Sequence, residues 1–145
     1  METAKRLVFD TSVYISAIRG GLFSPVFRML QETLPRAFLA SVVSAELLAG
    51  ATNPAARRTV MDFVRRAHKV RRVVTPDAGT WERAGTLFSE IRQGSPHLRP
   101  QVKMLWNDVL IALSARQVGA MIVTRNARDF ELLRQYIPFE LHILS

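Results

Sequence analysis

The chain has 145 residues, 48% of them apolar, a length that suits a single domain over residues 1–145 with one core. No apolar run approaches the ~20 residues of a membrane span, no secretory signal is visible, and cysteine is absent. These features exclude disulfides and thiolate metal sites and predict a cytoplasmic protein without membrane contact. The net charge of +8 favours a polyanionic partner such as nucleic acid.

Short apolar runs bounded by turn residues predict five strands, over residues 6–10, 37–40, 70–74, 120–124 and 139–143. Apolar residues at helical spacing predict helices between them, near residues 13–18, 25–30, 41–50, 54–67, 77–93, 105–115 and 126–133. Trp81 is expected on the inward face of its helix. Residues 95–101, with two prolines, are predicted to form a loop.

The alternation of strands and helices predicts an α/β fold, because parallel strands need crossover connections. We expect a three-layer helix–sheet–helix sandwich with a mainly parallel central sheet of four to five strands. The continuous apolar runs Leu7–Phe9 and Met121–Val123 suit central strands that are covered on both faces. Residues 139–143 alternate between apolar and polar side chains, as in a half-exposed edge strand.

Four acidic residues lie where such a sheet would gather them. Asp10 and Asp129 follow strands that end at the same edge, and Glu46 and Asp108 lie on helices that start or pass near it. Four unpaired carboxylates at one place would repel one another strongly without a cation. We therefore expect these four side chains to converge on one catalytic site.

Each acid also has a purely structural explanation. Asp10 could cap the helix that follows it, and Glu46, taken as a first-turn residue, could stabilise the helix dipole. Asp108 could be another early-helix acid. Asp129 lies three residues after Asn126, as in a variant of the capping box. The shared placement of the four at one sheet edge favours the catalytic interpretation.

Clustered oxygen ligands without cysteine or an evident histidine set favour a hard cation, Mg²⁺ with Mn²⁺ as a substitute. The expected ligands are Asp10, Asp108 and Asp129. Such an ion activates water for attack on a phosphodiester. Neighbouring hydroxyls are expected to orient the ligands, the water or the substrate: Thr11, Ser12 and Thr124.

Four segments in order along the chain resemble the signature segments of the PIN-domain nucleases, and most closely those of VapC-type toxins of bacterial toxin–antitoxin pairs. They are Asp10–Ser12, Ser44–Gly50, Asn107–Ala112 and Val123–Phe130. The resemblance implies a metal-dependent endonuclease acting on RNA, frequent homodimers, and inhibition by a small antitoxin. It assigns the family's first three acids to Asp10, Glu46 and Asp108.

The fourth family position is open between Asn126 and Asp129. We assign Asp129 as the acid and Asn126 as a polar ligand to water or RNA. Arg125 and Arg128 flank this segment and are predicted to contact the substrate phosphate. A strongly basic stretch along residues 57–72 is either a phosphate-tracking strip or a solvated helix face; its members are Arg57, Arg58, Arg65, Arg66, Lys69, Arg71 and Arg72.

Two alternative functions share this fold: a housekeeping PIN nuclease in RNA processing or decay, and a PIN-like RNA-binding protein without catalysis. A dinucleotide-binding enzyme is disfavoured because Asp10–Ser12 stands where the glycine-rich fingerprint would be needed. The apolar helices at residues 13–18 and 26–30 are expected to supply a homodimer interface.

Overall fold

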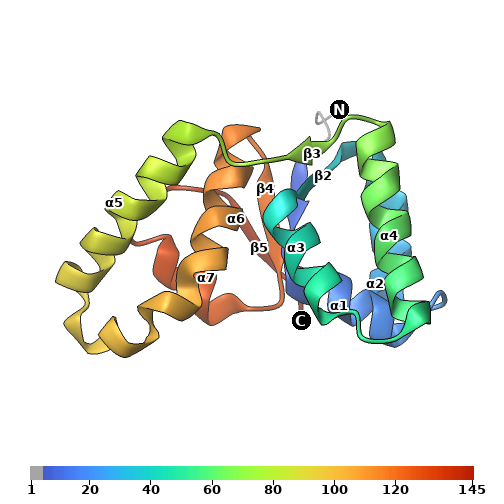
Figure 1. Ribbon diagram of the computed structural model, residues 1–145, viewed down its shortest axis with the longest axis horizontal. Helices are drawn as coiled ribbons and strands as arrows, with labels where there is room; N and C mark the ends of the chain where they lie inside the picture. The colour runs from blue at the N-terminus through green and yellow to red at the C-terminus, as the bar shows by residue number, and fades with distance from the viewer. Residues whose placement is uncertain (1–4) are drawn as a thin grey trace.

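The structure is a computed structural model that describes residues 5–145, apart from the side chains of Arg99 and Lys103. Within this range the strands form one five-stranded sheet in the order β3-β2-β1-β4-β5, and every neighbouring pair is parallel. The strands are β1 (Leu7–Phe9), β2 (Ala37–Ala40), β3 (Val73–Val74), β4 (Met121–Thr124) and β5 (Leu141–Ile143). The predicted α/β sandwich is confirmed (Figure 1).

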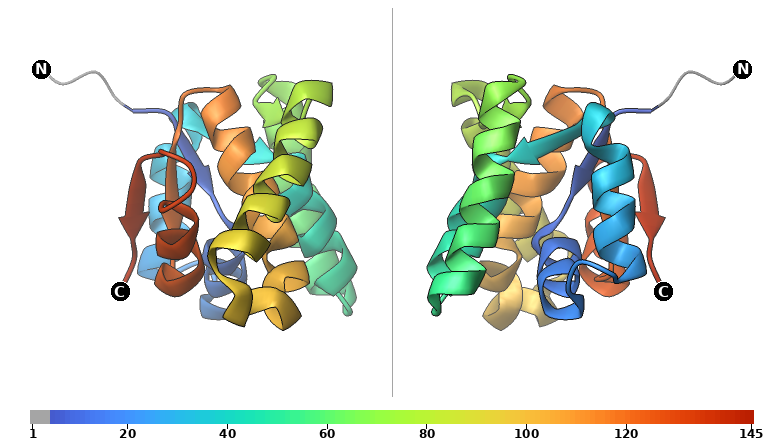
Figure 2. Two further views of the ribbon diagram at one scale, coloured as in Figure 1. Left: turned by 90° about the vertical axis from the view of Figure 1, so that its left-hand side faces the viewer. Right: turned by 90° about the vertical axis from the view of Figure 1, so that its right-hand side faces the viewer.

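The helices lie in two groups on either side of the central strands (Figures 1 and 2). Their bounds are α1 (Thr11–Gly20), α2 (Pro25–Thr33), α3 (Ser41–Gly50), α4 (Pro54–Lys69), α5 (Ala78–Gly94), α6 (Trp106–Gln117) and α7 (Ala127–Leu133). Two short 3₁₀ helices are η1 (Leu34–Arg36) and η2 (Pro96–Leu105). Helices α1, α2 and α4 pack together through edge or tilted ring contacts of Tyr14, Phe27 and Phe63. Helix α6 packs on α5 and contacts strands β1 to β4.

The centre of the sheet is the most buried part of the molecule. Val8 pairs with Phe38 on β2 and with Ile122 on β4, and Val8 and Ile122 are fully buried. This agrees with continuous apolar runs that need cover on both faces. Strand β5 forms one edge, and His142 on it is exposed, as the alternating pattern predicts, whereas Ile143, expected on the inward side, is 38% exposed. No helix in residues 5–145 has the length and apolarity that crossing a membrane requires.

Three local predictions are wrong. The strand expected at residues 70–74 is only Val73–Val74, because Arg71 has a positive φ of 57°, which breaks the extended backbone. The loop expected at residues 95–101 is the beginning of η2. Trp81 does not point inward: it is 47% exposed, with its ring 6.2 Å from that of Trp106.

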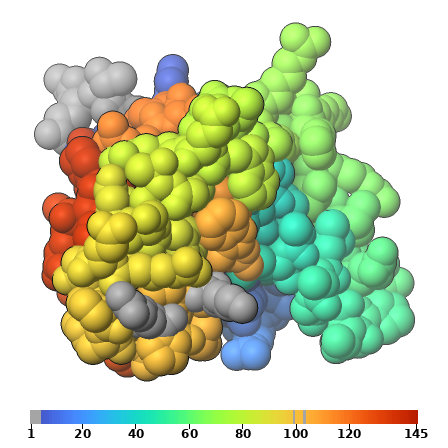
Figure 3. Space-filling model, turned by 60° about the vertical axis from the view of Figure 1, so that its left-hand side comes forward, coloured from blue at the N-terminus to red at the C-terminus, as the bar shows by residue number. Residues whose placement is uncertain are grey.

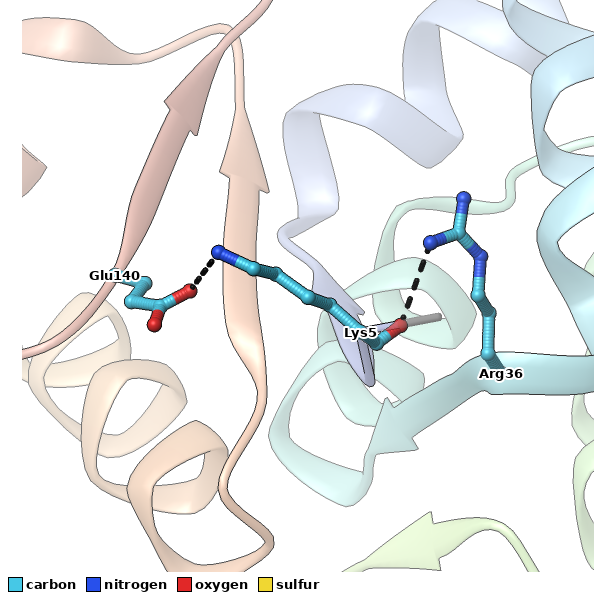
Figure 4. Close-up of polar contacts among 3 residues, drawn as sticks. All are labelled: Lys5, Arg36 and Glu140. Atoms are coloured by element: carbon cyan, nitrogen blue, oxygen red, sulfur yellow. Dashed lines mark hydrogen bonds and ion pairs between the residues drawn. The ribbon is translucent and has the colours of Figure 1, made fainter. Parts of the chain in front are cut away.

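Polar contacts of Lys5, just before β1, reach the segments that precede β2 and β5 (Figure 4). The Lys5 ammonium lies 2.9 Å from the Glu140 carboxylate, just before β5, and the Lys5 carbonyl accepts a hydrogen bond from Arg36 at 3.5 Å. Both charged side chains are mostly exposed, so the ion pair contributes about 1 kcal/mol or less. These contacts lie at the opposite end of the strands from the acidic residues described next.

Candidate active site

Asp10 stands at the carboxyl end of β1 and is only 4% exposed. Its backbone N–H donates to the Val123 carbonyl, which continues the pairing of β1 with β4. Its carboxylate accepts hydrogen bonds from Ser12 at 2.5 Å and from Thr124 at 2.8 Å. Asp10 occupies the N-cap position of α1, and its side chain makes no hydrogen bond of full capping geometry. Burial raises the pKa of Asp10, against the effect of the Ser12 and Thr124 hydroxyls and of the Val13 backbone N–H.

Glu46 is held against the start of α1 by a hydrogen bond from Thr11, whose hydroxyl lies 2.6 Å from a Glu46 oxygen. The expected position of Glu46 in the first turn is wrong. Helix α3 begins at Ser41, no acidic residue lies in its first turn, and Ala40 occupies the N-cap position. A helix-dipole explanation therefore does not apply, since that effect fades beyond the first turn.

The raised pKa of Asp108 indicates that the four acids share one electrostatic environment. Asp108 lies in the first turn of α6, and its pKa is raised to about 7. Burial is the largest cause, followed by the charges of Asp129, Asp10 and Glu46 and by a hydrogen bond with Asp129. Each of these acids comes from a different segment, so the structure brings together the four residues that the sequence proposed.

The fourth segment folds differently from a capping box. The Asn126 amide donates to the Asp129 carboxylate at 2.9 Å, and the Asn126 backbone N–H donates to the Thr124 hydroxyl at 2.8 Å. Asn126 is the N-cap residue of α7, yet its side chain makes no capping bond. Asp129 is half-buried and raises the pKa of Asp108, and the Asn126 amide orients its carboxylate.

Arg125 is fixed at both ends by serines of α1. Its backbone N–H donates to Ser12 at 3.1 Å, and its guanidinium donates to the Ser16 hydroxyl at 2.9 Å. Ser16 was not among the residues proposed from the sequence. The available signal was its spacing, because Ser12 and Ser16 are four residues apart and so share one face of α1.

The basic stretch at residues 57–72 lies mainly on the exposed side of α4 and is separate from the acidic cluster. Arg66 pairs with Asp62 at 3.1 Å, and Arg72 is half-buried and donates to the Leu34 carbonyl. A groove of about 490 Å³ connects Glu46 with the start of α4 and is also lined by Arg19 and Asn53. The groove reaches Glu46, but none of the basic residues of the 57–72 stretch lines it.

The oxygen atoms of the four carboxylates are the ligand type that a hard divalent cation prefers. Asp10 and Asp108 are largely buried and have raised pKa values, and a bound cation would lower both pKa values again. In the described part of the chain, no three acidic or histidine side chains already stand at metal-ligand spacing.

Comparison with known proteins places these features in a family. The PIN domain matches residues 7–135 of the chain. The structure of VapBC2 from Rickettsia felis bound to a promoter DNA fragment is similar at 20% identity and TM-score 0.64, over 96% of this chain and 98% of that one. DNA-bound VapBC from Salmonella typhimurium gives 22% identity and TM-score 0.64, over 97% and 98% of the two chains.

VapBC-5 from Mycobacterium tuberculosis, described as a member of the VapBC family of toxin–antitoxin systems, gives 20% identity and TM-score 0.53, over 97% of this chain and 100% of that chain. At such identities these likenesses establish a common fold. No curated protein sequence matches the chain.

Proposed function

Because this chain belongs to the PIN domain family, we propose that it is a metal-dependent endoribonuclease that hydrolyses phosphodiester bonds of RNA. One observation carries the proposal: Asp108 is close enough to Asp129, Asp10 and Glu46 for their charges to add to the effect of burial in raising its pKa. The net charge of the chain is +8 although it contains a cluster of acids. This charge supports a polyanionic substrate, which the basic surface would attract and which would be cleaved at the acidic cluster.

Asp10, Asp108 and Asp129 would hold the ion, Mg²⁺ or its substitute Mn²⁺. When bound, a divalent ion lowers the pKa of water and offsets negative charge on the phosphate. The chain's own contribution is orientation. Ser12 and Thr124 fix the two oxygens of Asp10, and Asn126 fixes Asp129.

The remaining polar groups act on the substrate. Glu46, oriented by Thr11, lies near the site to accept a proton from the attacking water. The water oxygen bonds to phosphorus, the bond from phosphorus to the leaving ribose oxygen breaks, and that oxygen takes up a proton. Arg125 binds a phosphate oxygen beside the scissile bond.

We further propose that the enzyme is the toxin of a toxin–antitoxin pair, works as a homodimer, and is inhibited by a small protein. The support is the likeness to VapBC structures. A second surface feature suits a protein partner: an apolar groove of about 440 Å³, lined by Tyr14 and Phe63 among others, with Arg66, Lys69 and Arg72 at its rim. Such a groove suits an acidic amphipathic segment.

The interface expected from helices 13–18 and 26–30 needs revision. Most of their apolar side chains, including Val13, Ala17, Phe27 and Leu30, are buried within one chain. The exposed apolar surface nearby is the turn between α1 and α2, where Phe23 is 88% exposed. The homodimer remains a proposal that sedimentation of the purified protein would test.

The central experiment is cleavage of a structured RNA by the purified chain with Mg²⁺, and then with EDTA. We expect Asp10→Asn and Asp108→Asn each to reduce the rate at least 100-fold, because each removes a charge that the ion requires. The matched control is Asp62→Asn, an exposed acid of α4 outside the cluster. Full activity in EDTA would refute the metal dependence, and full activity in the two variants would refute the assigned site. Binding of RNA without cleavage by the wild type would favour the non-catalytic alternative.

The toxin role needs its own test, because a housekeeping nuclease would give the same cleavage. Induced expression should arrest growth, and Asp10→Asn should relieve the arrest. Co-expression of the protein encoded next to this gene should restore growth by forming a complex. If expression of the active enzyme leaves growth unchanged, the RNA-processing alternative is favoured.

A further inference from the structure

A cavity between η2 and α7 adjoins the acidic cluster without being part of it. Its volume is about 290 Å³, and Asp129 lies in its wall. The opposite wall is η2, which lies at the surface at the same end of the molecule as α1 (Figure 3). Any group in this cavity would therefore lie next to a substrate bond held at Asp129.

The lining combines an apolar wall with unpaired polar groups. Leu105 is buried and Met104 is 79% exposed, and both contribute apolar surface to the lining. Gln101 and Arg128 are exposed, and within residues 5–145 their side chains have no hydrogen-bond or ion-pair partner. An amide and a guanidinium are thus available to a ligand.

We propose that this cavity holds a nucleobase of the RNA, that of the nucleotide next to the scissile phosphate. The inference rests on the nuclease function proposed above. An unstacked base has flat apolar faces and a polar edge. Met104 and Leu105 contact its face, and the Gln101 amide, which both donates and accepts, pairs with its edge.

The negative charge of Asp129 favours a neutral base in the cavity over an anionic ligand. Asp129 in the wall repels a free anion or an acidic side chain, whereas a base is neutral. Arg128, which lines the cavity beside Asp129, binds the phosphate to which the base is attached. Since Asp129 belongs to both the cavity and the acidic cluster, the base and the bond cut are separated by one nucleotide at most.

The test uses the full chain with Mg²⁺ and an RNA pool randomised over the cleaved region, with the cut ends sequenced. The wild type is expected to show a preference of about tenfold for one base at a position beside the cut, as one good amide pair to a base provides. Gln101→Ala and Met104→Ala should each lower this preference at least threefold at that position only. Their rates on the pooled RNA should fall less than tenfold.

The control is Gln31→Ala, which removes an exposed amide of α2 far from the cavity along the chain. It should leave both rate and preference unchanged. Because Gln101 and Met104 are exposed, their variants should also keep the unfolding temperature of the wild type within about 2 °C.

The outcomes separate this inference from the function on which it depends. Active variants with an unchanged preference at every position would overturn the base subsite and leave the nuclease intact. Loss of preference in the Gln31 variant as well would also overturn it, since the effect would not come from the cavity. A wild type that cuts no RNA would refute the nuclease, and the subsite with it.

Discussion

At the scale of single residues, Asp108 links the geometry of the cluster to a measurable property. Burial and the charges of Asp129, Asp10 and Glu46 raise the pKa of Asp108 to about 7, from an ordinary aspartate value of 3.8. A raised pKa means that the fold favours the protonated form. The stability contributed by the protonated group is fully present below about pH 4 and is lost as the pH rises through 7.

Without metal, the free energy of unfolding should therefore fall between pH 4 and pH 7 more steeply in the wild type than in Asp108→Asn. The amide should make the variant the more stable protein at pH 7.5, because it removes a charge that three neighbouring carboxylates repel. Urea unfolding in EDTA across this range measures both effects. Asp62→Asn serves as the control, and equal slopes in wild type and Asp108→Asn would contradict a shared site.

Ser16 and Arg125 give a second prediction at this scale. The Ser16 hydroxyl orients the guanidinium, so Ser16→Ala should raise the KM for RNA about fivefold, the effect of one hydrogen bond of ~1 kcal/mol. The kcat should change little, because the acids are untouched. Ser16→Thr keeps the hydroxyl and should restore the KM.

Initial-rate kinetics for Ser16→Ala, Arg125→Ala and the double variant test whether the serine acts through the arginine. The double variant should bind RNA no worse than Arg125→Ala alone. Ser89→Ala, on the exposed side of α5, is the control. Additive losses in the double variant would show that Ser16 does not act by positioning Arg125.

At the scale of elements, the turn between α4 and β3 illustrates how one backbone conformation limits a strand. Arg71 adopts φ 57°, so β3 cannot begin before Val73 and pairs with β2 over two residues only. The left-handed conformation strains any residue with a Cβ, and branched residues most.

Arg71→Val should therefore lower the free energy of unfolding by about 1–2 kcal/mol, whereas Arg71→Asn should be close to neutral. Both changes remove the same charge, so their difference isolates the backbone term. Arg71 is exposed, which excludes a packing effect. Thermal unfolding gives the comparison, and equal stability of the two variants would contradict the strained turn.

At the scale of the whole molecule, metal binding should couple to folding, because ions bind only where the four segments have come together. Mn²⁺ at about 100 times its dissociation constant should stabilise the wild type by ~2.7 kcal/mol. Asp10→Asn should lose most of this gain, and Asp62→Asn should keep it. Thermal melts with increasing Mn²⁺ measure the shift; an equal shift in all three proteins would mean that the ion binds elsewhere.

The sequence by itself determined the sheet and the residue types of the site. Buried strands such as β1 and β4 are read from unbroken apolar runs, and parallel pairing follows from the helices between them. Asp10 was placed at the sheet edge for the same reason, since it directly follows such a run. These are local signals, carried by periodicity and run length.

Only the tertiary structure decided how the acids are held. The partners of Glu46, Asp10 and Arg125 are Thr11, Thr124 and Ser16, each distant along the chain. A side-chain hydrogen bond between distant segments depends on how their backbones are set against each other, and no local pattern records that. The same limit explains why the sequence predicts a loop where η2 forms: η2 contacts α5 and α6, and these contacts exist only once the helices are packed together.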